Sequence, residues 1–173
     1  MARKTRKRYY RRKGRWSANI KPLTNQTLTL TTGSWFQATD LCINPAQSDS
    51  SVSQQYTVKN VEFNYELETS QNNSIEGVTC YIMYVPQGMT VTETFPIYHP
   101  EYIMAYKFIG TPEYQQAGTN YEQPKYRTRI KSRLARRLQT GDKVIFLIIG
   151  TNTSNNNVNS TFNGLIRWWT KAN

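Results

Sequence analysis

The residues best suited to chemistry stand at the start of the chain, where cationic and aromatic side chains are mixed without any acid. Nine of the first sixteen residues are Lys or Arg. They are Arg3, Lys4, Arg6, Lys7, Arg8, Arg11, Arg12, Lys13 and Arg15, and they are interleaved with Tyr9, Tyr10 and Trp16. Cationic groups neutralise phosphates, and aromatic rings stack on unpaired bases. This segment, called the arm and assigned residues 1–20, is therefore expected to bind nucleic acid without reading base sequence.

The charge of the chain is concentrated in this arm. The whole chain has a net charge of +11, whereas the 157 residues after Trp16 hold 13 basic and 11 acidic residues. A dense run of one charge repels itself and buries little apolar area, so we expect the arm to be disordered until a polyanion neutralises it. Nuclear import factors are compatible partners, because they read the same Lys/Arg runs. A secretory signal and membrane insertion are not expected, since the arm has no apolar stretch.

A second basic cluster lies near the middle of the body. Seven basic residues and no acid fall within thirteen positions: Lys125, Arg127, Arg129, Lys131, Arg133, Arg136 and Arg137. The first five occupy every second position, and on a strand this spacing places all five on one face. Three uses of this basic stripe remain open, namely a solvated strand face, a secondary nucleic-acid site, and ion pairing between subunits.

The sequence offers little that could support catalysis. His99 is the only histidine, and its neighbours Tyr98 and Pro100 suggest a loop, so a structural or solvated role is expected. Metal-ligand spacings and phosphate-binding glycine loops are missing from the sequence, and we expect no enzymatic activity, metal or cofactor. Cys42 and Cys80 lie in apolar, strand-like contexts and are expected to be buried free thiols.

The body is expected to be an all-β domain over residues 21–173. Within residues 61–67, Val61, Phe63, Tyr65 and Leu67 alternate with polar residues, which is the pattern of a half-buried strand. Other candidate strands cover residues 27–31, 78–85, 102–109, 126–134, 144–149 and 161–169. Seven or eight short strands separated by polar loops indicate an antiparallel sandwich or barrel.

Finer expectations follow from the same alternation. Residues 78–85 are apolar at both parities, which favours a strand covered on two sides. One of the adjacent Trp168 and Trp169 should lie in the core while the other faces outward. Gly141 and Asp142 suggest a tight reversal, and one helical turn is possible around Leu134–Leu138.

Three segments resemble the capsid proteins of small circular single-stranded DNA viruses, the circovirus-like group. They are the Arg/Tyr mixture of residues 1–12, the run Val58–Phe63, and the run Arg133–Leu138 followed by Thr140–Val144. The chain and its arm are shorter than is usual in that group.

The resemblance implies a specific fold and role. It implies an eight-stranded antiparallel jelly-roll sandwich that assembles, in about sixty copies, into an icosahedral shell. The arm would face inward onto packaged circular single-stranded DNA, and the protein would be found in the virion and, during assembly, in the host nucleus. Two alternatives remain open, which are a satellite RNA virus coat protein and a monomeric basic nucleic-acid-binding β-barrel module.

Overall fold

The chain folds almost entirely into β-strands. A computed structural model describes residues 16–44, 55–69, 75–110, 125–153 and 155–172. The strands in these ranges are β1 (Ser17–Leu30), β2 (Gly33–Ile43), β3 (Tyr56–Thr69), β4 (Ile75–Val85), β5 (Ile103–Gly110), β6 (Lys125–Lys131), β7 (Arg136–Leu138), β8 (Lys143–Asn152) and β9 (Val158–Ala172). One short helix, α1 (Phe95–Tyr98), and a 3-10 turn (Pro100–Tyr102) complete them. The expected all-β class is confirmed.

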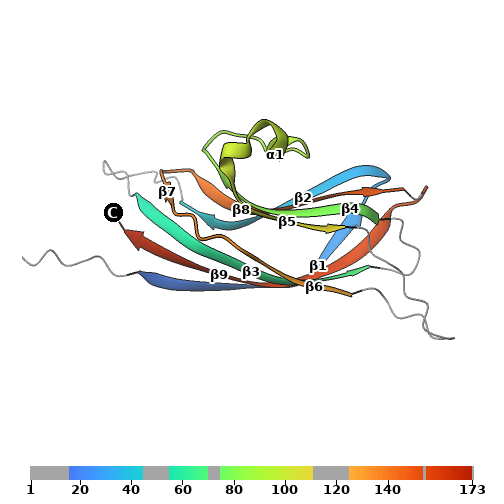
Figure 1. The fold of residues 1–173 in the computed structure, drawn as a ribbon, viewed down its shortest axis with the longest axis horizontal. Coiled ribbons are helices and arrows are strands. Elements are labelled where there is room, and N and C mark those ends of the chain that lie inside the picture. Colours follow the sequence, from blue (N-terminus) through green and yellow to red (C-terminus); the bar gives the residue numbers. More distant parts are fainter. Residues whose placement is uncertain (1–15, 45–54, 70–74, 111–124, 154, 173) are drawn as a thin grey trace, which may run out of the picture.

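The strands form two stacked antiparallel sheets (Figure 1). The five-stranded sheet has the order β1-β9-β3-β6, with β7 also paired to β3, and the four-stranded sheet has the order β2-β8-β4-β5. Strands β6 and β7 pair with successive stretches of β3, so they are two halves of one interrupted strand. Counted in this way, eight strands divide equally between the sheets, consecutive strands change sheet except for the β4–β5 hairpin, and the order is that of a jelly roll, as expected.

The main core lies between the two sheets and is built by the alternation expected for residues 61–67. Val61, Phe63, Tyr65 and Leu67 are all buried on β3. The Phe63 ring lies 4.4 Å from that of Phe146 on β8, measured between centroids. Burial of each such side chain contributes roughly 1.5–3 kcal/mol, so this layer is the main source of stability.

A second, smaller core covers the outer side of the four-stranded sheet. Ile145 and Leu147 of β8 point away from the main core and pack with Met83, Val85 and Phe95. Figure 1 shows α1 and its neighbouring segment lying over this side of the sheet. Residues 78–85 are therefore apolar on both faces because both faces of this strand are covered, as expected.

The interruption between β6 and β7 connects the two sheets. The Ser132 amide donates to the carbonyl of Val61 at 2.8 Å, and its hydroxyl donates to the carbonyl of Met104 on β5 at 2.8 Å. Gly141 has a φ of 84°, and the Asp142 amide donates to Gln139 O at 3.1 Å, which confirms the expected reversal before β8.

Two features of the fold differ from those expected, namely the start of the first strand and the structure of residues 134–138. Strand β1 begins at Ser17, so residues 17–20 belong to the sheet rather than to the arm. Ser17 lies opposite Thr170, and the side-chain Nδ2 of Asn19 donates to the Thr170 hydroxyl at 3.1 Å. The helical turn suggested around Leu134–Leu138 is wrong, because Arg136–Leu138 pairs with β3 as β7. No helix in the described ranges is both long and apolar enough to cross a bilayer.

The close approach of β9 to β3 gives a prediction about packing. A Cβ at Gly164 would lie 2.5 Å from Cε2 of Phe63. Gly164→Ala should therefore lower the free energy of unfolding by about 1–3 kcal/mol, as expected for overpacking. Urea denaturation of the variant measures this loss.

The double variant Gly164→Ala/Phe63→Leu is the control for this mechanism. If the added methyl group collides with the Phe63 ring, the double variant should be more stable than the sum of the two single changes predicts. Simple additivity would contradict the packing explanation.

Candidate nucleic-acid interface

Trp16 is the one arm residue that the structure describes, because Arg3 to Arg15, including Tyr9 and Tyr10, lie outside the described residues. Trp16 is exposed and directly precedes β1. The Lys59 ammonium lies 3.8 Å from the centroid of its ring, which is a cation–π contact. Trp16 is thereby held against β3, and the arm joins the body at this point.

Trp16 and Trp169 lie on the side of the five-stranded sheet turned away from the main core, here called the outer face. Trp168 packs against the core, so its neighbour Trp169 points the opposite way, as expected. Trp169 lies opposite Ala18 of β1 and Lys59 of β3. The Arg167 guanidinium lies 5.6 Å from the Trp169 ring centroid. The outer face therefore carries two aromatic rings, each contacted by a cation.

The basic stripe occupies the same face along β6. Arg127, Arg129 and Lys131 are exposed, while Ile130 between them is buried, which confirms the one-face arrangement for these three. Lys125 occupies the first position of β6, and its side chain lies outside what the structure describes. Arg133 is exposed in the segment between β6 and β7.

Two members of the stripe form ion pairs with β3 inside the sheet. Arg127 Nε lies 2.5 Å from Glu66 Oε2, and Arg129 Nη2 lies 2.7 Å from Glu62 Oε2. The hydrogen bond from Arg129 is the main reason that the pKa of Glu62 lies below its ordinary value of 4.5. Ion pairing within one chain is thus a use of the stripe that the sequence analysis did not consider.

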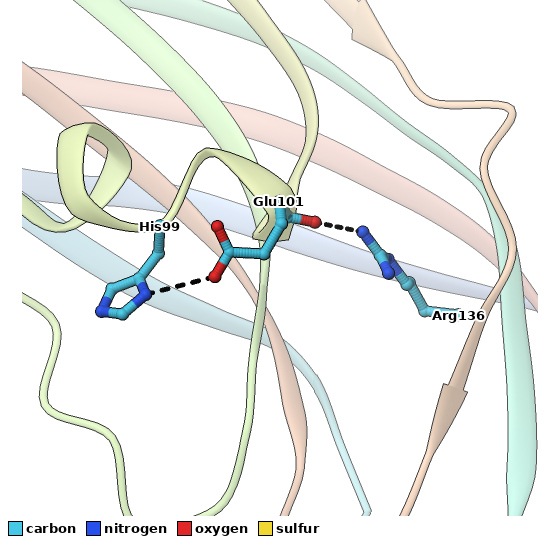
Figure 2. Close-up of polar contacts among 3 residues, drawn as sticks. All are labelled: His99, Glu101 and Arg136. Atoms are coloured by element: carbon cyan, nitrogen blue, oxygen red, sulfur yellow. Dashed lines mark hydrogen bonds and ion pairs between the residues drawn. The ribbon is translucent and has the colours of Figure 1, made fainter.

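Arg136 and Arg137 lie on opposite faces of β7. Arg137 is exposed on the outer face opposite Thr57, whereas Arg136 is not. Arg136 lies opposite Val58, which faces the core, so its side chain turns inward between the sheets. Its Nη2 donates to the Glu101 carbonyl (Figure 2), and its guanidinium lies 5.7 Å from the Tyr84 ring centroid. Strand alternation thus gives Arg136 contacts within the chain, and its assignment to a nucleic-acid or subunit interface stays a prediction.

His99 takes part in the same local structure. Figure 2 shows its Nδ1 directed at Glu101 Oε1, 3.3 Å away. Its ring stacks on Tyr102, with centroids 5.3 Å apart and an interplanar angle of 18°. These contacts fit the structural role expected for His99. The described ranges contain no cluster of three or more His, Cys, Asp or Glu residues that could hold a metal ion.

A shallow, open hollow of about 530 Å³ lies on the outer face where β6, β3 and β9 run side by side. Arg127 and Arg129 line it from β6, Asn64 and Glu66 from β3, and Asn163 from β9. Sequence reasoning missed the two asparagines, since only the strand register places Asn163 opposite Glu66. The alternation of residues 61–67 was the one available signal, and it placed Asn64 on the polar face.

The outer face as a whole is cationic. Its acidic side chains, among those that the structure describes, are Glu62 and Glu66. Its basic side chains in the described strands are Lys59, Arg127, Arg129, Lys131, Arg137, Arg167 and Lys171. Ile20 and Leu165 add exposed apolar surface. Such a mixture of cations with aromatic and apolar side chains can bind both the phosphates and the bases of a single strand.

Both cysteines are free thiols. Cys80 is fully buried, and burial raises its pKa to about 12. Cys42 is half-buried beside the Tyr56 hydroxyl, 3.4 Å from its Sγ, and burial raises its pKa as well. The expected buried free thiol is confirmed for Cys80.

Comparison with solved structures gives likenesses at low sequence identity. No family model and no curated protein matches the chain. A solved structure of infectious bursal disease virus, Gx strain, has a TM-score of 0.41 at 8% identity over 90% of this chain. The VP2 subviral particle of infectious bursal disease virus has a TM-score of 0.25 at 7% identity over 94% of this chain. The chain spans 32% and 43% of the lengths of those two solved chains.

The Glu62–Arg129 pair should make part of the stability depend on pH. Because the folded-state pKa of Glu62 is lowered, its contribution is present above the ordinary value of 4.5 and is lost as pH falls through the lowered pKa. Glu62→Gln should cost roughly 0.2–1 kcal/mol at pH 7, and the difference from the unaltered protein should shrink below pH 4.5. Thermal melts between pH 7 and pH 2.5 measure both effects.

Glu93→Gln, at an exposed loop position, provides the matched control. At every pH in this range, its melting temperature should equal that of the unaltered protein. A pH-independent effect of Glu62→Gln would show that the carboxylate charge plays no part.

Proposed function

We propose that this chain is the coat subunit of an icosahedral shell of about sixty copies that packages circular single-stranded DNA. The observation that carries the proposal is that one sheet of the jelly-roll body has a cationic, aromatic outer face and that the Lys/Arg-rich arm joins the body on that face. Phosphate-binding groups of arm and body therefore belong to one side of the subunit. The other side of the body is left for contacts of a different kind.

Exposed apolar side chains support self-association. Phe36, Tyr106 and Phe108 are exposed on strands of the four-stranded sheet, and Ile97 and Tyr98 are exposed on α1. Exposed apolar surface of this kind marks sites of contact between proteins. We infer that identical subunits bury these residues against one another.

The arm has enough charge to package a small genome. With nine cations for each arm, about sixty copies bring about 540 positive charges into the lumen. This charge offsets a substantial fraction of the phosphates of a genome of about a thousand or more nucleotides. The same Lys/Arg runs would be read by import factors, which fits assembly in the host nucleus and a final location in the virion. The subunit would act by binding and assembly, without an enzymatic step.

A monomeric nucleic-acid-binding module is the second candidate. It is favoured by the observation that Trp16, Trp169 and the basic residues of β6 form a face within a single subunit. A satellite RNA virus coat protein is a variant of the first proposal with RNA as its cargo, and sequencing of the copurifying nucleic acid distinguishes the two.

The size of the purified protein in solution should decide between shell and module. The shell proposal predicts megadalton particles with icosahedral outlines by light scattering and negative-stain microscopy. A species near 20.1 kDa at all concentrations would favour the module instead.

Deletion of residues 1–15 should separate assembly from packaging. This change keeps Trp16 and the whole of β1, so the body should fold and form particles. Their ratio of absorbance at 260 and 280 nm should fall well below that of particles formed by the full-length chain. Particles that keep a full nucleic-acid content would contradict the role of the arm.

A further inference from the structure

We propose that the hollow on the outer face is a nucleotide-binding subsite for single-stranded nucleic acid, distinct from the arm. This inference rests on the proposed function, since it takes the packaged strand as its ligand. In this subsite, Arg127 and Arg129 bind backbone phosphates while the amides of Asn64 and Asn163 contact a base. Trp16 and Trp169, at the other end of the face, provide a platform on which further bases stack.

The arginines have donors to spare for phosphate. A guanidinium has five N–H donors, and the short contacts to Glu66 and Glu62 use Nε of Arg127 and Nη2 of Arg129. The Arg127 side chain is 78% exposed and that of Arg129 is 54% exposed, so the remaining donors are open to a ligand. Ion pairs this exposed are weak, and a phosphate can bind beside the carboxylate or replace it.

The two glutamates act as positioning residues. Their side chains are only 14% exposed for Glu62 and 25% for Glu66, so they lie lower in the face than the arginines that cover them. Each holds one guanidinium over the sheet. Arg127 and Arg129 are two residues apart on β6, which separates their backbone positions by about 7 Å and lets them contact neighbouring phosphates of an extended strand.

The asparagines give the hollow its floor. Asn64 lies opposite Arg129 on β3, and Asn163 lies opposite Glu66 on β9. Both are shorter than the arginines of β6, so the surface is lower beside those long side chains. Side-chain amides offer both donors and acceptors, which suits the edge of an unpaired base.

A continuous path joins the hollow to the aromatic end of the face. Asn163 and Trp169 are six residues apart on β9, a distance of about 20 Å. Arg167 lies between them and contacts the Trp169 ring. Figure 1 shows no described element covering this side of the five-stranded sheet, in contrast to the side beneath α1. A single strand several nucleotides long can therefore lie along the face.

The test compares the full-length variant Arg127→Gln/Arg129→Gln with the unaltered protein, using a fluorescein-labelled 20-nucleotide oligo-dT as the probe. Anisotropy titrations at several salt concentrations give the slope of log K against log salt. Loss of two phosphate contacts should reduce that slope by about 1.4, since each contact on a single strand contributes about 0.7. An unchanged slope overturns the inference.

The matched control is Lys21→Gln/Lys143→Gln, which removes two cations that contact Asp40, away from the hollow. Its slope should equal that of the unaltered protein, and an equal loss in both variants would show that only net charge matters. Arg127→Lys/Arg129→Lys keeps the charge and guards against misfolding. It should retain the slope but bind the probe more weakly, because the forked donors are lost.

Ultraviolet crosslinking of purified particles distinguishes this inference from the proposed function. The proposed function fails if no particles form or if they contain no nucleic acid. The subsite fails alone if filled particles crosslink only through residues 1–15. Crosslinks to peptides holding Trp16, Asn163 or Trp169 support it, and Trp169→Ala should lower the affinity for the probe at least about five-fold.

Discussion

The contact of Phe63, Phe146 and Phe162 between the two sheets is the interaction on which the outer surfaces depend. Gly164 lets the Phe63 ring lie against β9, and this contact sets how β3 and β9 face each other. Because side chains alternate along a strand, the register that buries Phe63 also turns Glu62 and Asn64 outward. A slip of one residue would exchange the core for the charged face. The ion pairs and the hollow are thus consequences of core packing.

The alternation in β3 and β6 could be predicted from the sequence, because buried and exposed residues follow one another in turn along a half-buried strand. The pairing of Glu62 with Arg129 could not, because these residues are far apart in the chain and only the register joins them. Helix α1 has four residues, too few to show helical periodicity. The start of β1 at Ser17 was missed because the polar residues there pair with β9 at the end of the sandwich.

The two sheets have different outer surfaces, so one side of the molecule is apolar and the opposite side is charged. The segment around α1 fills the outer side of the four-stranded sheet with Phe95 and its neighbours, so a second apolar layer forms there. The five-stranded sheet has no such cover among the described elements and carries charge instead. A subunit built in this way can bind a polyanion on one side and apolar surfaces on the other.

The cation–π contact between Trp16 and Lys59 has a consequence for geometry. It gives the arm a fixed root on the body, so every charge before it is confined to a sphere around that root. Arg3 is thirteen residues away and can extend no further than about 45 Å. In the shell proposed above, tethered charge of this kind would form a layer of limited depth on the inner side of each subunit. The outermost nucleotides of any cargo would be held by such a layer, while those nearer the centre would be restrained only by their own neighbours.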